Sequence, residues 1–168
     1  KPVFMQGNKL LVFSSNRTSD TLKVQTDAEE QGATFDLFAY DFQTGNPVLK
    51  RLTDTPLANE KSPEQQKAGF IEYLSDQNGF YNLYSGRFDS TIAFVDTLVH
   101  YRYFMESQPR TDFTTNILYF TGSDFSEHQF VTAWQNDRQK LFRLTDNDFS
   151  SSGFGLRDST EYMRNLVS

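Results

Sequence analysis

The sequence predicts an all-β fold built from repeated four-stranded units, and three observations support this prediction. Among 168 residues there are 17 Phe and 8 Tyr but 1 Trp, and aromatic residues together with many Thr and Ser favour half-buried strands over helices. Short apolar runs are joined by turn dipeptides, as in GFIEYLSDQNGFYNLY over residues 69–84. Similar segments also recur at a fixed spacing along the chain.

The repeat has a period of 46 residues. Four pairs of similar segments are separated by 46 residues or by twice that number: Ile71–Ser75 with Ile117–Thr121, Glu60–Pro63 with Glu106–Pro109, Asp36–Phe38 with Asn82–Tyr84, and, at 92 residues, Arg51–Asp54 with Arg143–Asp146. Agreement of four pairs on one period is hard to obtain by chance. A fixed period of this length is typical of repeat architectures.

The first unit is expected to carry an insertion. Leu11–Ser15 matches Ile71–Ser75 at a spacing of 60 rather than 46, which leaves 14 extra residues. The polar, acidic stretch 17–34 has no sustained periodicity, as expected of a long surface loop. We therefore place the insertion there.

The middle unit shows what one repeat contains. Its four strands are expected at about 60–65, 69–75, 80–87 and 93–103. Asn78-Gly79, between the second and third strands, is the dipeptide favoured in type I′ hairpin turns. Along the second strand Ile71 and Tyr73 alternate with Glu72 and Leu74, so apolar groups lie on both sides. Such a strand must be sandwiched between neighbouring layers.

Four-stranded units of 40–50 residues that stack on both faces are typical of β-propellers. LLVFSSNR (10–17), FDLFAYDFQTGNPVLKRLTDTP (35–56) and KSPEQQKAGFIEYLSDQNGFYNLY (61–84) resemble the TolB-type, WD40-like (PD40) propeller repeat over about residues 7–149. The usual Ser-Pro-Asp-Gly is altered to Ser62–Gln65, and the Asn-Gly turn is replaced in the third unit by Gly122–Phe125. The resemblance implies about three four-stranded blades, at about 1–56, 57–102 and 103–149.

Three blades cannot close a ring, because propellers use roughly 4–8 blades. Open end blades expose apolar faces and unpaired strand edges. We therefore expect a partial propeller, either a segment of a longer protein or a chain that closes its ring with another chain. Residues 150–168 are expected to form a linker or short helix leading to the missing part.

Composition narrows the possible partners. The net charge of −6 lacks the basic excess that nucleic-acid binding requires. No apolar run approaches the ~18–20 residues of a transmembrane helix. With Cys absent, disulfides, thiolate metal sites and a Cys nucleophile are excluded. The expected partners are proteins or the remainder of a longer chain.

No catalytic residue, cofactor or metal site is expected within this chain. His100 and His128 have no local partner at metal-ligand spacing, and no G-x-S-x-G nucleophile elbow occurs. The acidic clusters Asp76–Gly79 and Asp146–Asp148 fit turn chemistry better than a Ca²⁺ loop, because neither has the closing Glu.

Two sets of residues are singled out. Arg51, Asp54, Arg143 and Asp146 recur in two units, which favours a structural role in turns or between blades over a ring of charges around a channel. Tyr101, Tyr103 and Phe104 alternate poorly, so some of them are expected to face a partner. The alternative is that they pack against a neighbouring blade.

The function expected from the resemblance is a non-enzymatic interaction scaffold of a bacterial cell envelope, as in TolB-like propellers. A substrate-gating propeller of a prolyl-oligopeptidase-like serine peptidase, with catalysis in another domain, is the alternative. A glycan-binding or glycoside-cleaving propeller is a third.

Periplasmic or outer-membrane-associated localisation in a Gram-negative bacterium is expected. Four segments resemble the O-glycan acceptor of exported proteins of some Gram-negative bacteria, where roughly one is expected by chance: Asp20–Leu22, Asp89–Thr91, Asp96–Leu98 and Asp158–Thr160.

Overall fold

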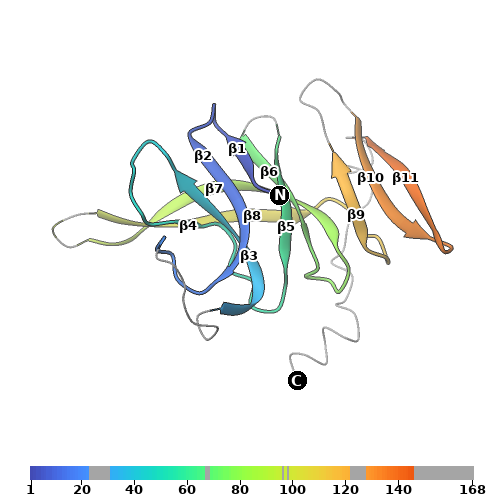
Figure 1. The fold of residues 1–168 in the computed structure, drawn as a ribbon, viewed down its shortest axis with the longest axis horizontal. Helices are drawn as coiled ribbons and strands as arrows, with labels where there is room; N and C mark the ends of the chain where they lie inside the picture. Colours follow the sequence, from blue (N-terminus) through green and yellow to red (C-terminus); the bar gives the residue numbers. More distant parts are fainter. Residues whose placement is uncertain (23–30, 67–68, 96, 98, 122–127, 146–168) are drawn as a thin grey trace.

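The computed structural model describes residues 1–22, 31–66, 69–95, 97, 99–121 and 128–145, and these form three antiparallel sheets (Figure 1). The first sheet contains β1 (Val3–Met5), β2 (Leu10–Arg17), β3 (Gln31–Asp41) and β4 (Lys50–Arg51). The second contains β5 (Glu60–Gln65), β6 (Phe70–Ser75), β7 (Asn82–Val95) and β8 (Val99–Pro109). The third contains β9 (Ile117–Thr121), β10 (His128–Gln135) and β11 (Arg138–Thr145). The all-β prediction is confirmed.

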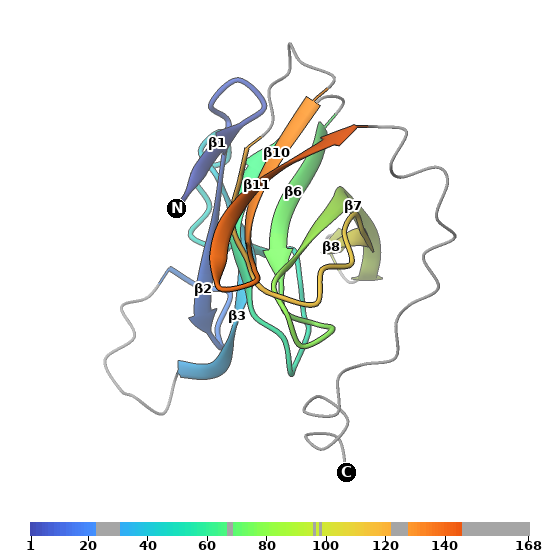
Figure 2. The same ribbon diagram turned by 90° about the vertical axis from the view of Figure 1, so that its right-hand side faces the viewer.

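The second sheet lies between the other two. Figure 2 looks along the row from the third sheet, with β10 and β11 in front of β6. Ile71 and Tyr73 of β6 belong to a core cluster shared with the first sheet, whereas Leu74 belongs to a cluster shared with the third. All residues from Ile71 to Ser75 are buried. The prediction that this strand is sandwiched is therefore confirmed.

The insertion in the first unit is also confirmed by strand register. Ser15 of β2 is opposite Asp36 of β3, and Ser75 of β6 is opposite Asn82 of β7. The spacing between corresponding residues is therefore 60 on the second strand and 46 on the third. The extra residues lie between Ser15 and Asp36. The expected loop over 17–34 is too long, because Arg17 ends β2 and residues 31–34 belong to β3; residues 23–30 are outside the described part.

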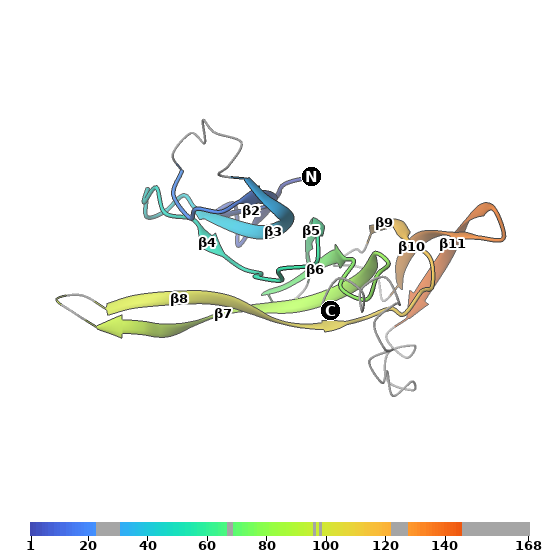
Figure 3. The same cartoon turned by 90° about the horizontal axis from the view of Figure 1, so that it is seen from below.

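The third and fourth strands of the second sheet are longer than expected. They pair from Tyr84 with Pro109 to Val95 with Val99 and form a long hairpin that extends past the rest of the sheet (Figure 3). The expectation of a fourth strand over 93–103 is wrong. Five of the eight residues from Phe88 to Val95 are β-branched or aromatic. Such residues favour extended structure, and the chain does not turn at residues 88–92.

The two-residue turn predicted between β6 and β7 is absent, and such a turn occurs elsewhere. The β6–β7 connection is not a two-residue type I′ turn at Asn78-Gly79. It is a longer loop in which the amide of Gly79 donates to the carbonyl of Asp76 at 2.7 Å. The two-residue turn is instead Asn136-Asp137, between β10 and β11, where both residues have positive φ (52° and 57°). Type I′ geometry requires this conformation, which Asn and Asp adopt more readily than most residues.

The third sheet begins at β9, which occupies the place that β5 has in the second sheet. Asn59 precedes β5, and its side-chain Oδ1 accepts a hydrogen bond from the amide of Phe35 at 3.2 Å. Asn116 precedes β9 and accepts from the amide of Tyr81 at 2.8 Å in the same way. The likeness of Ile71–Ser75 to Ile117–Thr121 therefore reflects strand alternation rather than equivalent position.

Glu106–Pro109 consequently belongs to β8 of the second sheet, paired with β7, and is not the counterpart of Glu60–Pro63 in β5. The unit boundary expected at 102/103 lies within β8. The expected four-stranded form holds for the first two sheets, whereas the third has three described strands. The residues expected to form a linker or helix, 150–168, lie outside the described residues. Within the described ranges there is no helix that could span a membrane.

Candidate functional site

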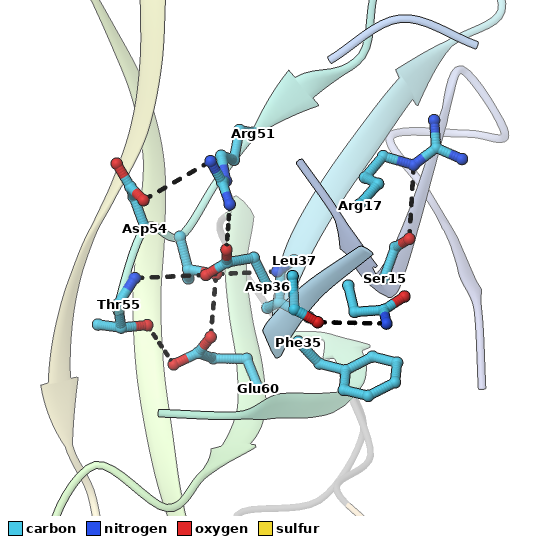
Figure 4. A network of polar contacts seen from close by, with 12 residues as sticks. Ser15, Arg17, Phe35, Asp36, Leu37, Arg51, Asp54, Thr55 and Glu60 are labelled. Carbon is cyan, nitrogen blue, oxygen red and sulfur yellow. Dashed lines mark hydrogen bonds and ion pairs between the residues drawn. The ribbon is translucent and has the colours of Figure 1, made fainter. Parts of the chain in front are cut away.

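A cluster of side-chain hydrogen bonds joins the end of β4 to β3 in the first sheet (Figure 4). The Asp36 carboxylate forms an ion pair with Arg51 at 2.6 Å. The same carboxylate accepts hydrogen bonds from the Thr53 hydroxyl and from the amide of Thr55, each at 3.3 Å. The Thr53 hydroxyl oxygen accepts from the amide of Leu37 at 2.8 Å. We call this arrangement the clasp.

The second sheet contains the same clasp with a neutral centre. Asn82 replaces the carboxylate and accepts from the Thr111 hydroxyl at 2.9 Å and from the amide of Phe113 at 2.7 Å. The Thr111 hydroxyl oxygen accepts from the amide of Leu83 at 2.9 Å. In both sheets the clasp therefore has a structural role: it connects the residues that follow the fourth strand to the third strand by hydrogen bonds. Buried polar groups need such partners.

Glu60 lies beside the first clasp, at the junction of the first and second sheets. Its side chain is buried, with 1% exposed. The carboxylate accepts hydrogen bonds from the hydroxyls of Thr55 at 2.5 Å and Ser75 at 3.2 Å. The Thr53 hydroxyl also lies 3.3 Å from it, and its single proton is shared between Glu60 and Asp36. Its donors are hydroxyls rather than cations. Burial raises the pKa of Glu60 to about 7; the Thr55 hydrogen bond opposes this rise, and the nearby Asp36 carboxylate adds to it.

A cleft of about 760 Å³ opens between β4 and β8, next to this junction. Its lining includes Asp20, Lys50, Arg51, Asp54, Tyr73 and Tyr103. The ammonium of Lys50 lies 2.9 Å from the Asp41 carboxylate and 4.7 Å from the centre of the Tyr103 ring. Hydrogen bonding to Lys50 lowers the pKa of Asp41. Since Arg51 is paired with Asp36 and Asp54, both cations of the cleft have carboxylate partners, and the cleft is poorly suited to an anionic ligand.

The three aromatic residues singled out in the sequence lie on β8. Tyr103 and Phe104 line the cleft, and the Tyr103 ring stacks on Phe88 of β7 at 5.5 Å with an interplanar angle of 8°. Tyr101 is opposite Ile92 in the β7–β8 ladder, and its side chain lies outside the described part. Tyr103 thus lies between its own sheet and the first sheet, where Lys50 covers it.

The recurring charged residues do not share one position. Arg51 and Asp54 form an ion pair at 3.7 Å next to the clasp, which is a structural setting. Arg143 is exposed on β11 opposite Phe130, in the strand that corresponds to β7 rather than β4. Asp146 lies outside the described residues.

The long β7–β8 hairpin is the most prominent projection in the described part of the chain (Figure 3). We call its distal part, residues 88–105, the arm. Ile92 and Val95 on this arm are 57% and 65% exposed. Apolar side chains on a projecting ribbon are a common feature of interaction sites. Sequence reasoning missed the arm, although the β-branched and aromatic residues from Thr91 to Val95 were an available signal.

His100 of β8 is opposite Phe94 of β7, and its side chain lies outside the described part. His128 begins β10. No cluster of three or more potential metal ligands is found among the described residues. Asp76 has a structural role, because its carboxylate accepts from the backbone and side-chain amides of Asn59 at 2.6 and 3.0 Å.

No protein-family model matches the chain, and no curated protein is significantly similar to it in sequence. The site therefore has to be interpreted from its own residues.

Proposed function

We propose that the three sheets are consecutive blades of a TolB-like β-propeller and that the chain is a non-enzymatic scaffold that binds a protein partner through the arm. The fold proposal is supported by the second sheet, which is covered on both faces, and by the clasp, which recurs in two sheets. The proposed setting is the envelope of a Gram-negative bacterium. Exposure of Ser90 and Thr97, two of the acceptor-like residues, on the arm is compatible with this setting.

The single observation that carries the binding proposal is the exposure of Ile92 and Val95 on the arm. Two-stranded ribbons are marginal on their own, and here the arm continues a four-stranded sheet that holds its base in place. Exposing large apolar residues is unfavourable in water at about 25 cal/mol per Å². A protein surface that covers them recovers this free energy.

Site-specific photo-cross-linking tests the proposal. A benzophenone amino acid at Val95 is expected to capture one discrete protein in cells of the source organism, and the same probe at exposed Lys140 of β11 serves as the control. Ile92→Asp should abolish the Val95 cross-link while lowering the free energy of unfolding by no more than about 1 kcal/mol, because the Ile92 side chain is already 57% exposed. Equal cross-linking from both probe positions would contradict the proposal.

A further inference from the structure

The arm has an open backbone edge along β7. β6 pairs with β7 only as far as Arg87, which is opposite Phe70, and just before Phe70 the chain turns back toward β5 at Gly69, where φ is 80°. Beyond Arg87, β7 pairs with β8 alone among the described residues. In this part of the chain, one edge of the arm therefore has no neighbouring strand from Phe88 onward (Figure 3).

The alternation of the β7–β8 ladder identifies the backbone groups that point to this edge. The amide of Arg110 donates to the carbonyl of Leu83 at 2.7 Å. In an antiparallel pair, residues that bond to the neighbouring strand alternate with residues whose backbone groups point to the other side. Counting from Leu83, the odd-numbered residues of β7 bond to β8. The amides and carbonyls of Phe88, Ser90 and Ile92 therefore point to the open edge.

Two observations agree with this assignment. Pro109 has no N–H and is opposite Tyr84, an even-numbered residue, so the β7–β8 ladder loses no hydrogen bond there. The amide of Ser90 donates to the side-chain carboxylate of Asp89 at 2.7 Å, as expected of an amide directed away from β8. A carboxylate from the same strand thus holds a place that the carbonyl of a further strand would take.

The open edge of β7 also lacks the usual protection against pairing. The segment Ser90–Val95, STIAFV, has no charged residue, Pro or Gly, and Ile92 within it is 57% exposed. Proteins protect strand edges by short length, charge or Pro. Such features occur on the last described strand of each sheet: Lys50 and Arg51 of the two-residue β4, Glu106 and Pro109 of β8, and Arg138, Lys140 and Arg143 of β11.

We propose that the protein partner adds an extended strand to β7, beside residues 88–92 of the arm. The inference rests on the proposed function, which assigns a protein partner to the arm. A row of backbone amides and carbonyls is matched by another extended backbone, which is the basis of recognition by strand addition. The third strand also stabilises a ribbon that is marginal with two. The β-bulge between Ile92 and Phe94 ends the regular ladder and limits the pairing.

Amide hydrogen exchange followed by NMR tests the added strand. It is measured on the isolated chain and on the covalent complex purified through the Val95 cross-link. In the isolated chain the amides of Phe88 and Ile92 should exchange fast, whereas those of Asp89 and Thr91, bonded to β8, should exchange slowly. In the complex, exchange at Phe88 and Ile92 should slow at least tenfold. Unchanged exchange at these two amides in the complex would overturn strand addition.

The same experiments distinguish the other possible occupants of the edge. Slow exchange at Phe88 and Ile92 in the isolated monomer would mean that a segment of this chain already covers the edge. A cross-linked product with twice the 19.4 kDa mass of the chain would mean that a second copy covers it. Either result would overturn the proposed partner strand.

A matched pair of proline variants tests the edge in cells. Ser90→Pro removes an amide at the open edge without removing a hydrogen bond to β8, and it should lower the yield of the Val95 cross-link at least tenfold. Ser107→Pro is the control, because Ser107 is opposite Gly86 and its amide points to the other edge of the ribbon. This variant should keep the yield. Far-UV circular dichroism establishes that the sheets of both variants are formed.

Failure of this inference differs from failure of the proposed function. If Val95 cross-links no protein in the wild type, the partner proposal is wrong and the strand proposal is wrong with it. If Val95 cross-links a partner and folded Ser90→Pro gives the same yield as Ser107→Pro, strand addition alone is overturned. If Ser90→Pro does not fold, the exchange pattern of the wild-type complex decides.

Discussion

Glu60 is predicted to make the stability of the protein depend on pH between about 4.5 and 7. Its ordinary pKa of 4.5 is raised to about 7 in the folded state, first by burial and further by the Asp36 carboxylate. In this interval the folded state holds a proton that the unfolded state has released. Stability is therefore fully present below pH 4.5 and is lost as the pH rises through 7.

The magnitude follows from the two pKa values. One pKa unit is worth about 1.4 kcal/mol, so the difference corresponds to about 3 kcal/mol of unfolding free energy between pH 4.5 and pH 8. This is a large part of the stability of a small domain, which is about 5–15 kcal/mol. Glu60→Gln keeps the shape of the side chain, retains one oxygen that can accept from Thr55 and Ser75, and removes the titration.

The assay is urea unfolding at a series of pH values from 5 to 8, followed by circular dichroism for the wild type and for Glu60→Gln. The wild type should lose unfolding free energy as the pH rises from 5 to 8, and the variant should lose less by about 2.5 kcal/mol. Histidine titration contributes equally to both proteins and cancels in the comparison. Parallel pH profiles for the two proteins would refute the reasoning about Glu60.

The remaining predictions concern packing, the clasp and the arm. Gly86→Ala should lower the free energy of unfolding by about 1–3 kcal/mol, because an added Cβ would lie 2.4 Å from the Ser107 hydroxyl and 2.5 Å from the Met105 side chain. Denaturation in a Met105→Ala background checks this cause, since the loss should then be smaller. Thr111→Val should cost about 1–3 kcal/mol by leaving the amide of Leu83 without its acceptor, whereas the exposed Thr114→Val should be near neutral. A probe at Val95 of the arm should cross-link one discrete partner protein, as described above.

Residue alternation was sufficient to predict the central strand of the fold. Ile71, Tyr73 and Leu74 showed that β6 is apolar on both sides, and the structure places two different sheets against those sides. The insertion before β3 was also predictable, because the two flanking strands keep recognisable sequences on either side of it.

Strand partnership was not predictable from local similarity. Ile71–Ser75 and Ile117–Thr121 share an alternating pattern that any buried strand can have, yet they lie in β6 and β9, at different places in their sheets. The true recurrence joins Thr53-Asp54 to Thr111-Asp112 at a spacing of 58. The longer β7–β8 hairpin changes this spacing, so a search for one fixed period misses it.

The hydrogen bonds of the clasp depend on which residues of neighbouring strands are opposite each other, and the sequence shows this register only indirectly. Asp36 and Asn82 were found as a repeated pair, but their acceptor role needs the residues that follow the fourth strand. Glu60 showed no sign of burial in the sequence, since an isolated Glu in a polar stretch is usually exposed. Its setting arises from the contact between two sheets.

The most direct test of the account is a nuclear Overhauser measurement on protein with labelled methyl groups and aromatic rings. Tyr73 and Leu74 are neighbours in sequence and belong to different core clusters. The account predicts contacts from the Tyr73 ring to methyl groups of the first sheet and from the Leu74 methyl groups to Ile117 and Val131 of the third. Contacts from both residues to one and the same sheet would contradict the row of three sheets on which the proposed function rests.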